Sequence, residues 1–179
     1  MSLKHGLLGF LSGSEYSGYD LEKMFRSSLV FFWNAKISQV YRDLHAMERQ
    51  GWVESIEVIQ RDRPSKKVYR ITDSGQGELQ DWLTNYDTVN DFEVRVGILM
   101  RMFFAAKRPT EETIALLEQF CITCRRVMET LQGVLEEVRL CAPKTMDALY
   151  SQTTLSYGLK YYQMQIDWCN ETITLLKNL

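Results

Sequence analysis

The residues with the clearest binding chemistry occupy one face of a segment at 36–50. Apolar side chains recur there every three or four positions, which predicts an amphipathic helix. The opposite face carries Lys36, Ser38, Gln39 and Arg42, which are cations or short hydrogen-bonding groups. Gln39 can pair with adenine through its amide, and Arg42 can pair with guanine or with a phosphate. A helix with this face suits the major groove of duplex DNA.

A second group of cations lies in a predicted turn around Pro64, between expected strands at 52–59 and 67–71. The first of these segments is rich in β-branched and aromatic residues, which favours a strand. Gly51 before it suits the end of the preceding helix. Cations at the turn could hold the flanking DNA backbone or enter the minor groove. Helix, strand, basic turn and strand in this order are the layout of a winged helix-turn-helix.

The helix and the turn together supply a candidate DNA-binding set. Lys36 and Ser38 suit phosphate contacts, because free backbone N–H groups point outward at the same end of the helix. The ring of Tyr41 faces the core side, yet its hydroxyl could reach a phosphate, so both roles stay open. The full set is Lys36, Ser38, Gln39, Tyr41, Arg42, Arg61, Arg63, Lys66 and Lys67.

The local charge agrees with a phosphate-binding surface. Residues 36–70 hold eight Lys or Arg and five Asp or Glu, a net charge of +3 (8 − 5), whereas the whole chain carries −2. A cationic patch on an otherwise acidic protein is what attraction to nucleic acid requires. Because this local charge is modest, a solvated basic hairpin without any nucleic-acid role remains an alternative.

The composition of the 179 residues is that of a soluble globular protein, with 45% hydrophobic and 25% charged residues. This length suits one domain or two small ones. No apolar run approaches the roughly 20 residues of a membrane-spanning helix, and no signal peptide is evident. Four cysteines without framework spacing indicate reduced thiols, so we expect a cytoplasmic protein.

The sequence offers no catalytic or cofactor-binding arrangement. Cys121 and Cys124 are spaced like metal ligands, but a zinc site needs four ligands and the chain has only two histidines. Both cysteines also lie on a predicted helical seam, which indicates buried structural thiols, with a thiol sensor as the alternative. His5 and His45 have no partners that suggest hydrolysis, and no glycine-rich phosphate loop occurs. We therefore expect no metal, no cofactor and no enzymatic activity.

The expected fold is mostly α, within the α+β class, and has two domains. A winged helix-turn-helix domain with a two-stranded wing covers 1–84, a polar linker covers 85–91, and an all-helical dimerisation domain covers 92–179. In the last of these, apolar residues recur at alternating steps of three and four along two long helices, which predicts coiled-coil-like packing. A small domain has little interior for two such seams, so we expect one to face a second subunit. The seam residues are Ile114, Leu117, Cys121, Cys124, Met128, Leu131, Leu155, Leu159, Tyr162, Ile166, Cys169 and Ile173.

Several segments of the first domain together resemble the PadR family of transcriptional regulators. They include SGYDLEK at 17–23 and RPSKKVYRITDSG at 63–75, with further similar segments at 6–9, 38–44 and 48–53. The second domain looks like the long helical C-terminal domain of one PadR subgroup. The resemblance implies a homodimeric cytoplasmic regulator, usually a repressor, on a roughly palindromic operator, paired through its C-terminal helices. It also implies that some members lose DNA affinity on binding phenolic acids or other aromatic or lipophilic compounds.

Two further interpretations concern an effector and a partner. Aromatic side chains are numerous enough to line an apolar pocket between the two domains, although aromatic residues at helical spacing are more often plain core. The alternative function is a winged-helix protein-interaction module, whose hairpin docks an acidic partner without sequence-specific DNA binding. The candidate pocket residues are Phe10, Phe103, Phe104, Tyr157, Tyr161 and Trp168.

Overall fold

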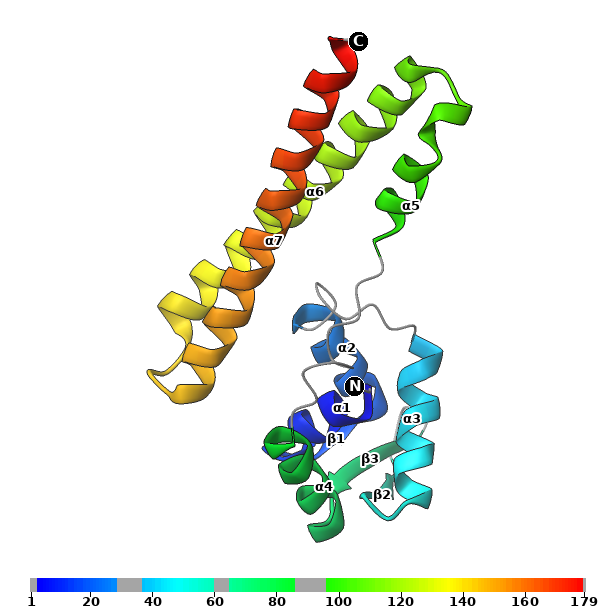
Figure 1. Cartoon of the computed structure of the whole chain (residues 1–179). Helices are drawn as coiled ribbons and strands as arrows, with labels where there is room; N and C mark the ends of the chain where they lie inside the picture. The colour runs from blue at the N-terminus through cyan, green and yellow to red at the C-terminus, as the bar shows by residue number, and fades with distance from the viewer. Residues whose placement is uncertain (1–2, 29–36, 60–64, 86–95, 179) are drawn as a thin grey trace. The chain divides into compact units, whose positions relative to one another are not determined.

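The structure is a computed structural model, and the chain divides in it into two compact units, Met1–Val94 and Arg95–Leu179 (Figure 1). Most of the predicted linker at 85–91 lies outside the described residues. The residues that the structure describes are 3–28, 37–59, 65–85 and 96–178.

Helices dominate both units, and strands occur in the first unit alone among the described residues. This confirms the mostly α, α+β class expected from the sequence. The elements of the first unit are α1 (Leu3–Leu11), β1 (Tyr16–Ser17), α2 (Gly18–Ser28), α3 (Ile37–Arg49), β2 (Val53–Val58), β3 (Lys66–Ile71) and α4 (Asp73–Thr84). Those of the second unit are α5 (Gly97–Phe103), the short 3₁₀ helix η1 (Ala105–Lys107), α6 (Thr110–Cys141) and α7 (Met146–Lys177).

The described sheet has three antiparallel strands in the order β1-β3-β2, one more than the two strands expected from the sequence. β2 and β3 form the wing and pair along their whole length, with Val53 opposite Ile71 at the base. β1 adds Tyr16 opposite Tyr69 at the other edge of β3. A run of two residues is too short to show an alternating pattern, so periodicity could not reveal β1.

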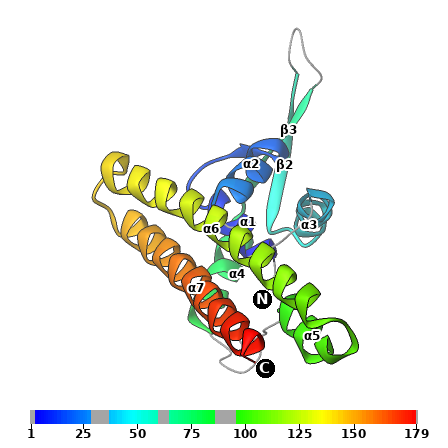
Figure 2. The same ribbon diagram turned by 90° about the horizontal axis from the view of Figure 1, so that it is seen from above.

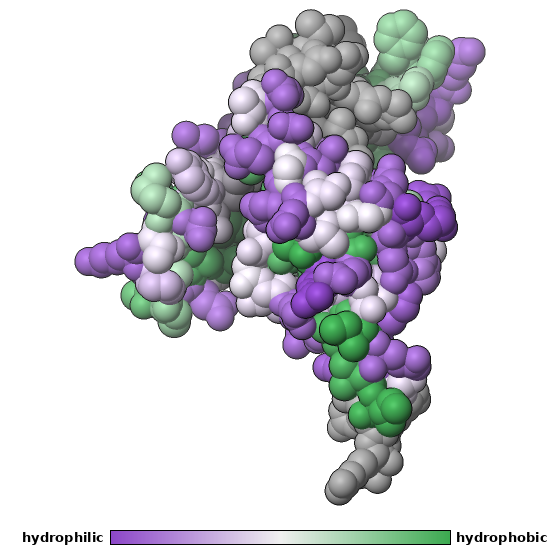
Figure 3. Space-filling model, turned by 90° about the horizontal axis from the view of Figure 1, so that it is seen from below, coloured by the Kyte–Doolittle hydropathy of each residue, from purple (hydrophilic) through white to green (hydrophobic). Residues whose placement is uncertain are grey.

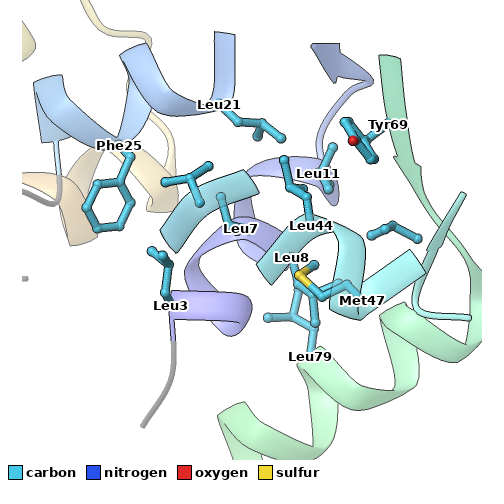
Figure 4. Close-up of a cluster of buried hydrophobic side chains, with 12 residues drawn as sticks. Leu3, Leu7, Leu8, Leu11, Leu21, Phe25, Leu44, Met47, Tyr69 and Leu79 are labelled. Atoms are coloured by element: carbon cyan, nitrogen blue, oxygen red, sulfur yellow. The ribbon is translucent and has the colours of Figure 1, made fainter. Parts of the chain in front are cut away.

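A cluster of buried side chains from α1, α2, α3, β2, β3 and α4 forms the core of the first unit (Figure 4). Leu7, Leu8 and Leu44 have no exposed surface in it. Burying each leucine stabilises the fold by about 1.5–3 kcal/mol. Leu44 and Met47 belong to the apolar side of α3, so the core holds this helix by one face and leaves the opposite face to solvent.

The turn between α3 and β2 is joined closely to the start of α4. Gly51 has a φ of +73°, a conformation that glycine adopts readily at helix ends. Thr72 caps α4, because its Oγ1 accepts the backbone N–H of Gly75 at 3.1 Å and donates to the carbonyl oxygen of Gly51 at 2.6 Å. A Cβ atom added at Gly75 would collide with the backbone carbonyl of Trp52. The base of the wing and α4 therefore pack backbone against backbone.

In the second unit, α6 and α7 run side by side as a long antiparallel pair (Figure 2). Leu131 of α6 packs against Gly158 of α7, where an added Cβ atom would come within 3.2 Å of a Leu131 methyl carbon. Towards the end of α7, Nζ of Lys177 lies 3.7 Å from a carboxylate oxygen of Glu118. The close approach of Leu131 to Gly158 sets the register of the two helices, and the exposed ion pair adds little to it.

The predicted seams of α6 and α7 meet one another within a single chain. Seven seam residues are buried there, and the other five are half-buried. Each helix therefore covers much of the seam of the other, and the expectation that a seam also faces a second subunit stays a prediction. The buried seam residues are Leu117, Cys121, Cys124, Leu131, Leu155, Ile166 and Cys169, and the half-buried ones are Ile114, Met128, Leu159, Tyr162 and Ile173.

Two glycines of α4 provide a matched test of the close packing at the base of the wing. We expect Gly75→Ala to lower the free energy of unfolding by about 1–3 kcal/mol, because the new methyl group collides with the Trp52 carbonyl. Gly77→Ala meets no atom within 4 Å, so it should raise the free energy of unfolding by about 0.5–1 kcal/mol through helix propensity. Urea unfolding followed by circular dichroism measures both. Equal effects of the two substitutions would contradict the packing described here.

Candidate nucleic-acid interface

The outward face of α3 carries the polar side chains that the sequence assigns to a DNA groove. Ser38, Tyr41 and Arg42 are exposed there, and Gln39 is half-buried. Nε of Arg42 lies 3.8 Å from a carboxylate oxygen of Asp43, and the Arg42 side chain is 71% exposed. An exposed pair this long contributes little stability, so the guanidinium can leave it for a phosphate or a base. Hydroxyl, amide and guanidinium groups thus share one accessible helix face.

Of the four cations of the predicted wing, two lie among the described residues. Lys66 and Lys67 begin β3 and are exposed. Arg61 and Arg63 lie outside the described residues, and so does Lys36 before α3. Of the nine candidate residues, six therefore have a described position, and these six lie on α3 and at the start of β3.

Lys67 is held by the carboxylate of Glu48, near the end of α3. The two carboxylate oxygens lie 2.9 and 3.1 Å from Nζ of Lys67, and Ser55 of β2 donates a hydrogen bond to one of them. The hydrogen bond from Ser55, followed by that from Lys67, holds the pKa of Glu48 below its usual value. Glu48 in turn raises the pKa of Lys67. Glu48 therefore joins α3 to both strands, and the charge of Lys67 is partly compensated before any phosphate approaches.

Tyr41 combines a packing role with an accessible edge. Its ring lies over Gly18, where an added Cβ atom would come 2.7 Å from Cε1 of the ring. The residue is 37% exposed, so part of the side chain stays accessible. Burial raises the pKa of Tyr41, so the hydroxyl stays protonated at neutral pH and can donate a hydrogen bond. The two roles that the sequence left open are thus compatible at this position.

The wing also carries apolar side chains that sequence reasoning did not single out. Figure 3 shows hydrophobic residues gathered on the wing, and Ile56, Val58 and Ile59 are exposed on and just beyond β2. Ile56 lies opposite Val68 of β3, and such cross-strand apolar pairs stabilise a hairpin. The strand pattern alone could have revealed them, because Ile56 and Val58 alternate with polar residues. The wing therefore combines exposed apolar side chains on and just beyond β2 with cations at the start of β3.

The second unit holds all four cysteines of the chain, and three of them are buried. Cys121, Cys124 and Cys169 are buried between α6 and α7, whereas Cys141 is exposed. Burial, together with neighbouring Cys121, raises the pKa of Cys169 to about 12, so its thiol stays protonated and unreactive at neutral pH. Among the described residues, no three His, Cys, Asp or Glu side chains are grouped to hold a metal ion.

The candidate pocket residues do not all belong to one unit. Phe10 packs against the core of the first unit, and Trp168 packs against that of the second. Trp168 also borders a surface hollow of about 380 Å³ along α7. Phe103 and Phe104 are exposed and touch edge to face, with ring centroids 5.1 Å apart. The other two candidates lie on α7, where Tyr157 is exposed and Tyr161 is half-buried. An effector pocket built from the six residues remains a prediction.

Two family models match the chain one after the other. The transcriptional regulator PadR-like family matches residues 7–81, and the virulence activator alpha C-terminal family matches residues 94–177. A probable transcriptional regulator of Mycobacterium tuberculosis is 31% identical over 99% of this chain and 98% of its own length. The negative transcriptional regulator PadR of Bacillus subtilis is 31% identical over 78% of this chain and 76% of its own length. The chain belongs to the PadR family.

Solved structures extend the likeness of this PadR-family chain over both of its units. A crystal structure of a Streptococcus mutans protein has a TM-score of 0.86 at 28% identity and covers 97% of this chain and 99% of its own. The complex of Bacillus subtilis PadR with operator DNA has a TM-score of 0.81 at 26% identity, covering 97% and 98%. The same PadR with p-coumaric acid has a TM-score of 0.75 at 25% identity, covering 98% and 95%.

These comparisons confirm the family inferred from the sequence and make the chain a DNA-binding transcriptional regulator of the winged-helix type. The two curated relatives are regulators of transcription rather than enzymes. In the PadR-family chain itself, no described helix combines the length and the apolar content that crossing a membrane requires.

The Glu48 carboxylate gives the PadR-family fold a defined pH dependence. Its pKa is lowered in the folded state, so its stabilisation is fully present above the unfolded pKa and is lost as the pH falls through the folded pKa. We expect Glu48→Gln to lower the free energy of unfolding by about 1 kcal/mol at pH 7, where the partial exposure of Glu48 keeps this value small. Near pH 2 the substitution should have no effect, because the carboxylate is then protonated. Denaturant unfolding at both pH values measures this difference. Glu118→Gln, at an exposed pair on α6, is the control and should change little at either pH.

Proposed function

We propose that this PadR-family chain is a cytoplasmic repressor that binds a palindromic operator as a homodimer. We further propose that a small aromatic or lipophilic compound releases it from DNA. The observation that carries the proposal is the exposed polar face of α3, which a fully buried apolar face holds in place beside the wing. The likeness to PadR solved with operator DNA, which spans both units, supports it.

Base reading is assigned to two side chains of α3. The Gln39 amide suits adenine, and the Arg42 guanidinium suits guanine or a phosphate. Ser38 at the start of the helix suits a phosphate, as do the wing cations. Arg61 and Arg63 belong to the same proposal, together with Lys36. Two such helices in a dimer would enter successive major grooves, about 34 Å apart.

Pairing of two chains is assigned to the second unit. Its helices retain large exposed apolar side chains after α6 and α7 have packed together, among them Leu140, Tyr150 and Tyr157. Exposed apolar surface of this kind commonly marks an interface between proteins. A second copy of the chain would cover it, and light scattering of the purified protein should then give twice the mass of one chain. A mass of one chain at micromolar concentration would oppose the dimer.

Repression and ligand release are the finer parts of the proposal. One curated relative is a negative regulator, which supports repression, although the family model of the second unit is described from a virulence activator. PadR of Bacillus subtilis has been solved with p-coumaric acid, which supports an aromatic effector for this chain. Such a compound can release DNA only if it binds the DNA-free arrangement of the chain more tightly than the DNA-bound one.

The protein-interaction module remains the rival function, and DNA binding separates the two. The purified chain should bind the duplex upstream of its own gene, or a duplex selected from a random pool, far more tightly than a scrambled duplex. The affinity should fall steeply as salt rises, because phosphate contacts release counterions. Weak binding that ignores sequence would favour the interaction module.

One substitution tests base reading directly. We expect Gln39→Ala to weaken binding to the cognate duplex by about 1–3 kcal/mol and to leave binding to scrambled duplex nearly unchanged, because only the base-specific hydrogen bonds are lost. Fluorescence anisotropy titrations with both duplexes measure the two affinities. Gln80→Ala on α4 is the matched control and should bind both duplexes like the unsubstituted chain. Equal losses on both duplexes for Gln39→Ala would remove its base-reading role.

A further inference from the structure

The outer side of β2 is a strand edge without a partner among the described residues. β2 stands at one end of the strand order β1-β3-β2, and all six of its residues pair with β3. Soluble proteins usually blunt such edges with lysine, proline, a bulge or a very short strand. The segment 53–59 contains no lysine and no proline, and the pairing of β2 with β3 has no bulge. An edge of this kind can accept a further strand.

A hydrogen bond at the base of the wing shows which backbone groups of β2 point outward. The Thr72 N–H donates to the Trp52 carbonyl oxygen at 3.0 Å, so these residues form a hydrogen-bonded pair of the ladder. Hydrogen-bonded and non-hydrogen-bonded pairs alternate along antiparallel strands. The backbone groups of Val53, Ser55 and Glu57 therefore point away from β3, and they form no hydrogen bond with any described residue. These are the groups that an added strand would bond.

Apolar side chains gather on the wing beside this edge (Figure 3). Ile56 and Val58 are 53% and 38% exposed, on the side of the sheet opposite the buried Val53. Ile56 has Val68 of β3 on one flank, and its other flank faces the open edge. Strand addition draws its affinity from backbone groups and its specificity from alternate side chains, and this edge offers both.

The two carboxylates of β2 are already engaged within the wing. Nε of Arg70 donates to a carboxylate oxygen of Glu54 at 2.6 Å, and Oγ of Ser65 donates to one of Glu57 at 2.6 Å. A carboxylate with a partner repels a like charge less than a free one does. Two copies of this edge can therefore approach one another.

One antiparallel register makes two copies of the edge complementary. The outward groups can bond only if odd-numbered residues face one another, which excludes registers with Ser55 opposite Ile56. A register with Glu57 opposite its own copy sets like charges face to face. A register with Ser55 opposite its own copy leaves no apolar pair between the two β2 strands. The remaining register sets Ile56 opposite Ile56 and Ser55 opposite Glu57.

This register would align apolar side chains across four strands. Val68 and Ile56 are neighbours within one chain, and Ile56 and Val68 of the second copy would continue the row. The two Ile56 residues would form a non-hydrogen-bonded pair, the kind in which side chains lie closest. On either side of it, Ser55 and Glu57 would exchange both of their backbone hydrogen bonds.

We propose that β2 pairs in this register with β2 of a second copy of the chain and thereby joins copies bound at adjacent DNA sites. Two edges of six residues bury far less surface than a stable complex requires, so the contact forms when DNA holds two copies close together. The proposal rests on the DNA-binding function proposed above and adds cooperation between neighbouring sites to it.

Single cysteines test the register, in a Cys141→Ser background that removes the exposed native thiol. On a duplex with two cognate sites, Ile56→Cys should form a disulfide between copies, because a non-hydrogen-bonded pair has the Cα separation that a disulfide needs. Glu54→Cys alone and Val58→Cys alone should form none, whereas a mixture of these two variants should, since the two positions face one another. Non-reducing electrophoresis after mild oxidation measures the links, with the spacing between sites varied through one helical turn. A duplex with one site is the control.

The backbone hydrogen bonds have a matched pair of variants. Glu57→Pro removes an outward N–H and leaves the bonds between β2 and β3 intact, because strand edges tolerate proline. Glu57→Ala loses the same side chain but keeps the N–H. We expect the unsubstituted chain and Glu57→Ala to bind the second site about tenfold more tightly once the first is filled. Glu57→Pro should lose this gain and keep its affinity for a single site. Gel-shift titrations measure both affinities, and circular dichroism checks the fold.

The outcomes separate wing pairing from DNA binding. If the unsubstituted chain binds no duplex, the DNA-binding function fails, and pairing on DNA fails with it. If it binds two sites without cooperativity at any spacing and Ile56→Cys forms no cross-link, pairing is disproved while DNA binding stands, and the edge is left to a strand of another protein. Cooperativity that survives Glu57→Pro would also disprove pairing through β2. A cross-link from Glu54→Cys alone or from Val58→Cys alone would overturn the register.

Discussion

The carboxylate of Glu48 connects the three elements on which recognition depends. It lies near the end of α3 and takes hydrogen bonds from Ser55 of β2 and Lys67 of β3. A hairpin attached only through its strand ends could pivot about its base, which would change the angle between wing and helix. A carboxylate shared by helix and both strands limits that pivot. The position of the outward face of α3 relative to the wing is thus set inside one unit.

The buried face of α3 imposes the complementary constraint. Leu44 and Met47 are fully enclosed by side chains from elements before and after α3 in the chain. A rotation of the helix that carried Gln39 away from the groove would also pull these residues into solvent, at a cost of several kcal/mol. Packing therefore fixes which face is polar and accessible. The face that we propose for DNA binding therefore has an orientation that the core has already selected.

Local sequence signals predicted much of the first unit, and the misses share one physical cause. The helix at α3, its stop at Gly51 and the wing strands follow from periodicity and from residues with special backbone preferences. β1 is defined solely by its pairing with β3, and the engagement of Lys67 depends on Glu48, 19 residues away. Both are tertiary contacts, and a pattern in neighbouring residues carries no information about them.

In the second unit, too, the local sequence pattern carried no information about tertiary contacts. Its heptad pattern correctly marked the residues that become buried, such as Leu117 and Cys169, but a pattern cannot identify which surface covers them. The helices cover one another, so the aromatic and aliphatic residues left outside the seam became the surface available to a partner. The candidate DNA residues on α3 lie on its outer side, as expected, because the apolar periodicity of a helix alone separates its two faces.

The distribution of thiols makes the chain simpler to probe than its cysteine count suggests. Three of the four cysteines are enclosed between α6 and α7, and Cys169 stays protonated far above neutral pH. Cys141, at the last residue of α6, is exposed. Towards a maleimide reagent the folded chain therefore behaves as a protein with one cysteine. A single fluorophore or spin label placed there, without any substitution, reports on the far turn of the helical hairpin while the seam remains intact.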